Sequence, residues 1–342
     1  MAGDCIRQIP RRGFVLSLAA TILMMAAASA PSLFYPQIAE RLGLIPVATT
    51  LVFAVYTFTL LAALLYLGPL SDHVGRRPVV AAGSLALALS VAMFWFAGSL
   101  AALLVARALQ GLAAGLLIPA LSAMMIDFES PSHRNIAALW NTIGPMIGLG
   151  AGALGAALLL DLTSEPTTAV FGSLVLAFLI VATVVWSTPE LVPKTQIRRG
   201  DLRPRFTVPP HLRRMFTAGV PVIIAGWATN GLFLALGADL VGSELGGSTH
   251  TQAGIVLFAL AISGVTASSV LQRRSARTIS LYATSALAFG TAVSIGALAL
   301  GSYPAYVASV AIVGSGFGTA FLGVLRTLMP HTASSERAAV MA

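Results

Sequence analysis

The stretch Gly68-Pro69-Leu70-Ser71-Asp72-His73-Val74-Gly75-Arg76-Arg77-Pro78 separates two long apolar runs. The run before it, residues 46–67, contains no charged residue, and neither does the run after it, residues 79–104. Runs of this length can cross a bilayer as helices, so the charged stretch is predicted to be a turn at the membrane surface. Asp72 lies at the C-terminal end of a predicted helix, where the helix dipole disfavours a carboxylate, and Arg76 and Arg77 are near enough to offset that cost. A residue that is unfavourable in its local setting but stabilised by charged partners indicates a functional position.

The composition is that of a membrane protein. Of the 342 residues, 57% are hydrophobic and only 9% are charged, whereas soluble domains are nearer a quarter charged. The net charge of +8 could indicate nucleic-acid binding; however, the basic residues are spread over loops on one predicted side of a membrane, and we predict no nucleic-acid partner. The single cysteine, Cys5, excludes a disulfide framework and a cysteine-based metal site.

The apolar runs predict an all-α polytopic protein with about ten transmembrane helices, because each run approaches the ~20 residues that a spanning helix needs. The first run could be read as a signal peptide, but it continues through Leu33 and Phe34, and we interpret it as the first span. The predicted spans are Gly13–Pro36, Pro46–Leu70, Val79–Gly98, Leu100–Ile126, Ile136–Leu160, Ala169–Trp186, Met215–Leu236, Ala253–Leu271, Thr278–Leu300 and Ala305–Leu325.

One long polar segment divides these spans into two groups. Residues 187–214 hold seven arginines and lysines and five prolines, which is typical of a linker. We therefore predict an N-terminal six-helix bundle over residues 1–186, a cytoplasmic linker over 187–214 and a C-terminal bundle over 215–342. Each half has a charged turn between its second and third helices, as expected for the parallel repeats of a transporter.

The loop charges predict the orientation. With a cytoplasmic N-terminus, inside segments hold all of the 20 Lys and Arg residues except Arg41, in an outside loop, and Arg107, in a span. This asymmetry follows the positive-inside rule. We expect a multi-pass protein of the cell membrane, surrounded by lipid.

Arg107 is the only charged residue well inside a predicted span, and Gln110 lies one helical turn further on. An arginine at this depth costs roughly 2.5–3.5 kcal/mol on the insertion scale unless it meets water or a partner. We favour a polar site in a substrate cavity, and the alternative is an arginine that extends along the helix to the outer interface.

The fifth predicted span carries Asn141, Gly144, Pro145 and Gly148. Glycines four residues apart form a smooth stripe that lets another helix approach closely, and Pro145 removes a backbone hydrogen bond and can bend the helix. The stripe with its proline suits a hinge for a moving gate, and it suits static packing as well. Asn141 is a polar group that needs a partner.

In the seventh span, Trp227 and Asn230 lie one turn apart and could line the substrate cavity or serve as core and helix-contact residues. Gly150-x-Gly152-x-x-Gly155 matches a dinucleotide-binding pattern, but it lies inside a predicted span and not between a strand and a helix, so we set it aside. No motif of a phosphate-binding loop, zinc protease or nucleophile elbow is present, and the five histidines show no ligand spacing. We predict no enzyme, no metal and no cofactor. No Asp or Glu lies at the middle of a span, and Asp239 is the nearest candidate for carrying a proton.

These motifs together resemble a known family. Gly68-x-Leu70-x-Asp72-x-x-Gly75-Arg76-Arg77 is similar to the signature between helices 2 and 3 of the major facilitator superfamily. Arg107-x-x-Gln110-Gly111 resembles that family's fourth-helix motif, and Gly144-Pro145-x-x-Gly148 resembles the fifth-helix motif of its drug–proton antiporter branch. Trp140 stands where the last motif usually has glycine, and the resemblance covers residues 12–342.

The resemblance implies a fold of two six-helix bundles that rock around a central cavity. It implies a secondary transporter that moves a small organic solute outward by alternating access, with protons as a coupling ion. It also implies a cytoplasmic gate that joins the charged turn to an acid at the end of helix 4, where Asp127 stands. The predicted gate residues are Gly68, Asp72, Gly75, Arg76, Arg77 and Asp127.

The family pattern has two more helices than this sequence. The chain ends where helix 11 would begin, so the second bundle is expected to be incomplete, with four helices. The alternative to a working exporter is therefore a truncated remnant that does not transport.

Overall fold

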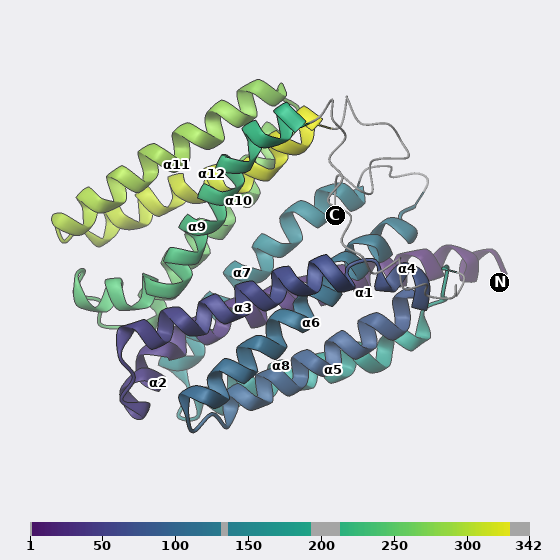
Figure 1. Ribbon diagram of the computed structural model, residues 1–342, viewed down its shortest axis with the longest axis horizontal. Helices are drawn as coiled ribbons and strands as arrows, with labels where there is room; N and C mark the ends of the chain where they lie inside the picture. Colours follow the sequence, from purple (N-terminus) through teal and green to yellow (C-terminus); the bar gives the residue numbers. More distant parts are fainter. Residues whose placement is uncertain (1, 131–135, 193–212, 329–342) are drawn as a thin grey trace. The chain divides into compact units, whose positions relative to one another are not determined.

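The computed structural model describes residues 2–130, 136–192 and 213–328, and within them the regular elements are helices (Figure 1). The predicted linker lies mostly outside the described residues, as does the tail from residue 329. Ten helices of the described part are long and apolar enough to cross a membrane, as the sequence predicts. Helices suit lipid because each satisfies its own backbone hydrogen bonds there.

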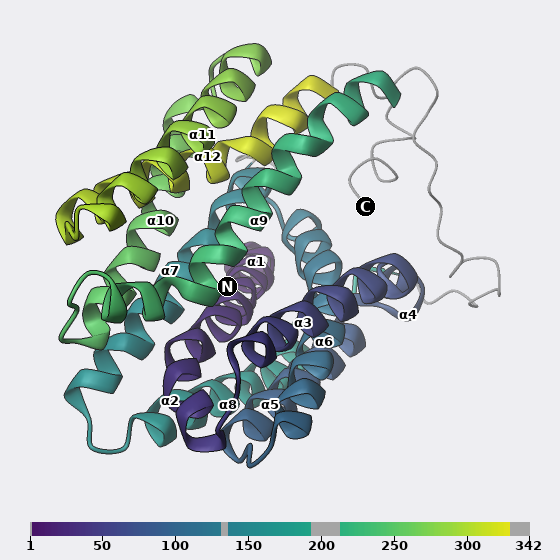
Figure 2. The same ribbon diagram turned by 60° about the vertical axis from the view of Figure 1, so that its left-hand side comes forward.

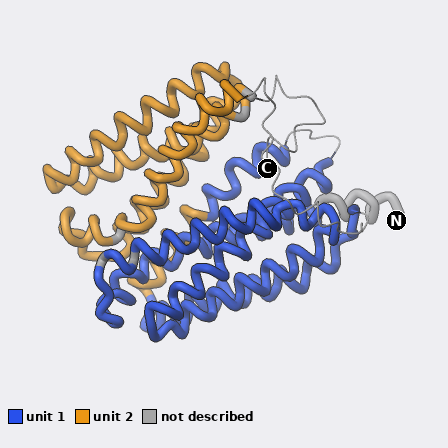
Figure 3. The backbone as a smooth tube through the Cα atoms, viewed as in Figure 1, with its two compact units in different colours: residues 1–148, 163–204 blue, residues 149–162, 205–342 orange. Residues whose placement is uncertain are grey.

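Contacts divide the chain into two compact units (Figure 3), residues 1–148 with 163–204 and residues 149–162 with 205–342. Unit 1 contains α1 (Ala2–Ser29), η1 (Ala30–Phe34), α2 (Tyr35–Leu42), α3 (Pro46–Leu67), α4 (Leu70–Val74), α5 (Arg76–Trp95), α6 (Leu100–Asp127), the first part of α7 (Ile136–Leu162), α8 (Pro166–Val184) and η3 (Val185–Ser187). Unit 2 contains the rest of α7, α9 (Arg213–Ser243), α10 (His250–Leu271), α11 (Ala276–Ala299) and α12 (Tyr303–Leu328).

In unit 1, α6 packs against α1, α3 and α5 (Figures 1 and 2). Ser99 directly precedes α6, and its side chain accepts a hydrogen bond from the amide of Ala102 at 3.2 Å and so caps the helix. Gly83 of α5 leaves room for Leu117 of α6, because a Cβ at Gly83 would lie 2.6 Å from Leu117 Cγ. The result is a buried α6 whose polar residues are enclosed by neighbouring helices.

In unit 2, α12 packs against α9, α10 and α11, and it is the most buried of the ten candidate spans. Its glycines allow this packing. A Cβ at Gly314 would lie 2.0 Å from the carbonyl oxygen of Leu260 in α10, and one at Gly316 would lie 2.9 Å from the carbonyl oxygen of Ala283 in α11. Small residues at such positions let helix backbones approach closely in a membrane.

Candidate functional site

The charged turn contains the short helix α4 between α3 and α5. Gly68 follows the last residue of α3, and Gly75 joins α4 to α5 with φ at +104°. Glycine adopts this backbone conformation without a steric penalty, and other residues do not. A Cβ at Gly75 would also lie 2.6 Å from Glu190 Oε2. The backbone conformation therefore favours glycine at this position, and a Cβ here would also displace the Glu190 carboxylate.

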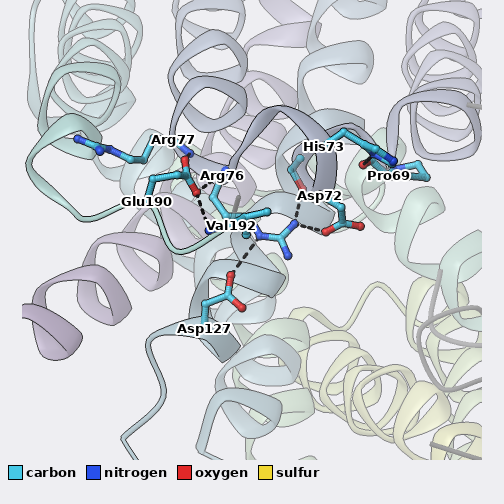
Figure 4. Close-up of polar contacts among 9 residues, drawn as sticks. Pro69, Asp72, His73, Arg76, Arg77, Asp127, Glu190 and Val192 are labelled. Carbon is cyan, nitrogen blue, oxygen red and sulfur yellow. Dashed lines mark hydrogen bonds and ion pairs between the residues drawn. The ribbon is translucent and has the colours of Figure 1, made fainter. Parts of the chain in front are cut away.

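Arg76 connects the turn to the end of α6 (Figure 4). Its Nη1 donates to the carboxylate of Asp72 and, at 2.7 Å, to Ser71 Oγ, while its Nε donates to Asp127 Oδ2 at 3.2 Å. The side chain of Arg76 is 13% exposed, and that of Asp72 is 59% exposed. An exposed ion pair contributes little, about 0–1 kcal/mol. The structure thus brings the three predicted gate residues Asp72, Arg76 and Asp127 together.

Glu190 is a member of this cluster that the sequence reasoning missed. It follows η3, and its carboxylate oxygens accept hydrogen bonds from the backbone amides of Arg76 at 3.0 Å and Arg77 at 2.9 Å. These are the first amides of α5, where a carboxylate is favoured by the unpaired N–H groups and the helix dipole. The sequence signal is slight: Glu190 is the one acid in residues 187–200.

Arg77 makes contacts of a different kind. Its guanidinium donates to the backbone carbonyl of Trp186 and lies over the Trp186 ring, with 5.5 Å between Cζ and the ring centroid. Together with Glu190, this contact ties the beginning of α5 to the end of α8 and η3. All of these residues belong to unit 1.

Arg107 lies inside unit 1 and is 1% exposed. Its Nε donates to Tyr35 Oη at 2.6 Å and its Nη1 donates to Gln110 Oε1 at 2.5 Å, while Gln110 Nε2 donates to the carbonyl of Ala27 at 2.9 Å. Four aromatic rings surround the guanidinium with their centroids 5.0–5.5 Å from Cζ; they are Tyr35, Phe53, Tyr56 and Phe94. Such cation–π contacts help to offset the cost of burying the charge.

Gly111 explains how two of these rings reach Arg107. A Cβ at Gly111 would lie 2.1 Å from Thr59 Oγ1 and 2.4 Å from the carbonyl oxygen of Tyr56, both in α3. Because glycine has no side chain here, α3 packs directly on α6. This close packing holds Phe53 and Tyr56 against the guanidinium. Gly111 therefore supports the group of residues around Arg107.

The remaining predicted site residues lie elsewhere. Asn141 of α7 donates to the carbonyl of Ser122 in α6 at 3.4 Å. Gly144, Pro145 and Gly148 lie within the continuous helix α7. Trp227 and Asn230 belong to unit 2: Trp227 is 54% exposed and meets Phe317 edge-on at 5.3 Å, while Asn230 is buried.

Asp239 lies in α9 beyond the candidate span Arg213–Gly237. Partial burial raises the pKa of its carboxyl above the ordinary value. Within the described ranges, no three His, Cys, Asp or Glu side chains form a group that could hold a metal ion.

Comparison with known proteins assigns the chain, with its charged turn and its Arg107 group, to a family. Residues 16–342 match the sequence model of the Major Facilitator Superfamily. The chain belongs to this superfamily. Its members are transporters rather than enzymes, and the charged turn and the Arg107 group lie within the matched residues.

Two relatives within the superfamily have names that refer to drug resistance. The puromycin resistance protein pur8 of Streptomyces alboniger is 32% identical over 152 residues, which are 42% of this chain and 30% of the relative. The multidrug efflux pump LfrA of Mycolicibacterium smegmatis is 34% identical over 143 residues, 38% of this chain and 28% of the relative. The matches thus span less than a third of each relative's length.

A solved structure shares the superfamily's fold. It is a bacterial homologue of the human lysosomal transporter Spinster, in an inward-facing and unoccupied conformation. The TM-score is 0.71 at 13% sequence identity, and the alignment covers 97% of this chain and 77% of the other. The likeness concerns the fold alone.

Proposed function

We propose that this chain is a secondary transporter that exports small, largely apolar organic compounds by alternating access. The observation that carries the proposal is Arg107, a charged side chain held within a spanning helix of a chain that belongs to a transporter superfamily. Charged residues inside membrane spans mark substrate or ion pathways, because their burial is costly. The names of the two relatives support export rather than uptake.

The proposed moving parts are the predicted N-terminal bundle and C-terminal bundle, joined by the cytoplasmic linker. Arg107, Gln110, Asn141, Trp227 and Asn230 are the proposed substrate contacts, α7 with Pro145 is the proposed hinge helix, and the turn with Asp72 and Arg76 is the proposed cytoplasmic gate. We place the protein in the cell membrane with its N-terminus inside, following the distribution of Lys and Arg.

A flux assay tests the proposal. The purified chain is reconstituted into liposomes, and efflux of a broad panel of small organic compounds is followed with and without an imposed pH gradient. We expect protein-dependent flux that is lost in Arg107→Ala and kept in the control Arg41→Ala. Arg41 is an exposed arginine of α2 that donates to the carbonyl of Ala97 at 2.8 Å.

The alternative of a truncated remnant that does not transport is not favoured, because the matched relatives are named as resistance and efflux proteins. The assay separates the two readings: absence of flux for every compound, from a chain that elutes as a folded monodisperse species, would overturn the proposal. Flux that depends on the pH gradient supports protons as the coupling ion, and flux that ignores the gradient contradicts it.

A further inference from the structure

Six exposed arginines of unit 2 lie at one end of its helices. Arg326, in the last turn of α12, donates from Nη1 to the backbone carbonyl of Arg274 at 2.8 Å, which joins α12 to the loop between α10 and α11. The beginning of α9 lies beside the same end of α12, because a Cβ at Gly219 would lie 2.9 Å from Val324 Cγ1. The exposed arginines of this end are Arg213, Arg214, Arg273, Arg274, Arg277 and Arg326.

No acid of the described part of unit 2 lies near these arginines. Its acids are Asp161, Asp239 and Glu244, at the other end of the helices. Asp161 accepts hydrogen bonds from the first two residues of α10, and the other two acids are at the end of α9. In unit 1, by contrast, Arg76 of the charged turn is paired with two carboxylates. The arginine-bearing end of unit 2 therefore keeps its positive charge.

The side chains of Arg273, Arg274 and Arg277 are accessible to a ligand. Each is exposed, and no described residue forms an ion pair with any of them. Ser275 accepts a hydrogen bond from the amide of Thr278 at 3.2 Å, which fixes the start of α11 among them. A guanidinium presents paired N–H donors that match the oxygens of a phosphate group. Three guanidinium groups on one loop therefore suit a phosphate.

Exposed apolar side chains lie next to the arginines along the helices. Val270, in the last turn of α10, is 68% exposed, and Leu281, in the second turn of α11, is 62% exposed. Both belong to candidate membrane spans. Arginines at the ends of spans, with apolar side chains beside them, match a phospholipid, whose phosphate lies at the membrane surface and whose acyl chains lie in the hydrocarbon. A soluble phosphate compound would contact only the arginines.

We propose that this end of unit 2 binds the headgroups of anionic phospholipids, with Arg273, Arg274 and Arg277 on the phosphate oxygens. The inference goes beyond the proposed function, because lipid binding requires no transport. In the predicted orientation these arginines face the cytoplasmic leaflet. Each arginine near an anionic membrane surface strengthens binding roughly fivefold, so the three together contribute on the order of a hundredfold.

Native mass spectrometry of the detergent-purified full chain measures the binding. The probes are phosphatidylglycerol, which is anionic, and phosphatidylcholine with the same acyl chains, which is zwitterionic. We expect phosphatidylglycerol to bind at least about tenfold more tightly. The triple variant Arg273→Gln, Arg274→Gln, Arg277→Gln should lower this preference at least about tenfold. The triple variant with lysine at the same positions keeps the charge and should keep most of the preference.

A further triple variant controls for net charge. Arg198→Gln, Arg199→Gln, Arg203→Gln removes the same charge from the predicted linker and should leave the preference for phosphatidylglycerol unchanged. An equal fall in the two glutamine variants would assign the preference to the net charge of the chain and overturn the inference. A wild-type chain that binds the two lipids equally well would overturn it too.

Salt and a soluble headgroup complete the test without any variant that must fold. Because salt screens exposed charges, the preference should fall as the salt concentration rises, and a preference that ignores salt contradicts the role of the arginines. Glycerol 3-phosphate carries the phosphate without acyl chains. We expect an excess of it to leave phosphatidylglycerol bound, because it makes no contact with Val270 and Leu281. Full displacement would assign the arginines to a soluble phosphate compound and overturn the lipid assignment.

Discussion

Arg76 and Arg77 are adjacent arginines with different partners. The side chain of Arg76 joins Asp72 and Asp127, whereas that of Arg77 stacks on Trp186. Their backbone amides share one partner, the carboxylate of Glu190. The beginning of α5 is thus held by a residue more than 110 positions away in the sequence, and the side-chain ion pairs are a separate interaction.

At this scale we predict that Glu190→Ala destabilises the protein more than Asp72→Asn does. Glu190 satisfies two backbone amides at a helix N-terminus, and loss of such a cap costs about 1–2 kcal/mol. Asp72 is 59% exposed and Arg76 has two other acceptors, so its substitution costs less than about 1 kcal/mol. The measurement is the unfolding midpoint of each variant in detergent.

Glu165→Ala is the control for these two variants. Glu165 precedes α8, its side chain makes no capping hydrogen bond, and it is exposed, so its substitution should leave the midpoint unchanged. A midpoint for Glu190→Ala equal to that of the control would show that the two amide hydrogen bonds do not contribute to stability.

The sequence could predict part of this cluster. Asp72 and Arg76 are four residues apart and therefore near each other in any helical turn, and Asp127 was implied by the family resemblance. The Glu190 contact could not be predicted, because it depends on where the end of α8 lies relative to α5. The same limit applies to Arg107: its depth in the span was evident, but its aromatic neighbours come from α2, α3 and α5.

Among the helices, α7 shows how glycine position decides packing. A Cβ at Gly148 would lie 2.3 Å from the carbonyl oxygen of Ile22 and 2.7 Å from Met25 Cβ, both in α1. A Cβ at Gly144 would meet only Leu18 Cδ1, at 3.1 Å. The two glycines are on one stripe, yet only Gly148 faces a rigid backbone at close range.

We therefore predict that Gly148→Ala destabilises the protein, whereas Gly144→Ala is close to neutral. Alanine favours the helix by about 1 kcal/mol over glycine, but at Gly148 its Cβ forces α1 and α7 apart, at a cost of about 1–3 kcal/mol. At Gly144 the flexible end of Leu18 can move aside. Thermal unfolding in detergent measures both variants, and equal midpoints would contradict the packing explanation of the stripe.

The helices themselves were predictable because each apolar run is about as long as a bilayer is thick. The ends and bends of the helices were harder to predict from the sequence. The first predicted span, Gly13–Pro36, is α1 followed by the 3-10 turn η1 and then α2, so that the candidate span extends to Leu42. Pro31 and Pro36 stand near the starts of η1 and α2, where a missing N–H costs nothing.

For the molecule as a whole, loops that the charge rule predicts on one side of the membrane are in contact with one another within each unit. In unit 1 the predicted cytoplasmic residues Asp72, Asp127 and Glu190 gather around Arg76. In unit 2 the predicted outside residue Asp161 accepts hydrogen bonds from the amides of His250 and Thr251, at 3.1 and 2.7 Å. Each unit taken by itself is thus consistent with one orientation.

This orientation gives the last prediction, which concerns accessibility from the two sides of the membrane. In a Cys5→Ser background, Ser164→Cys is placed in the loop after α7 and Ser275→Cys in the loop before α11. Both serines are exposed, and neither substitution changes a charge. Because inside loops carry the arginines, a membrane-impermeant maleimide should label Ser164→Cys in intact cells and Ser275→Cys only after permeabilisation. The reverse pattern would mean that Arg273, Arg274 and Arg277 lie outside, which would overturn the cytoplasmic assignment of the charged turns.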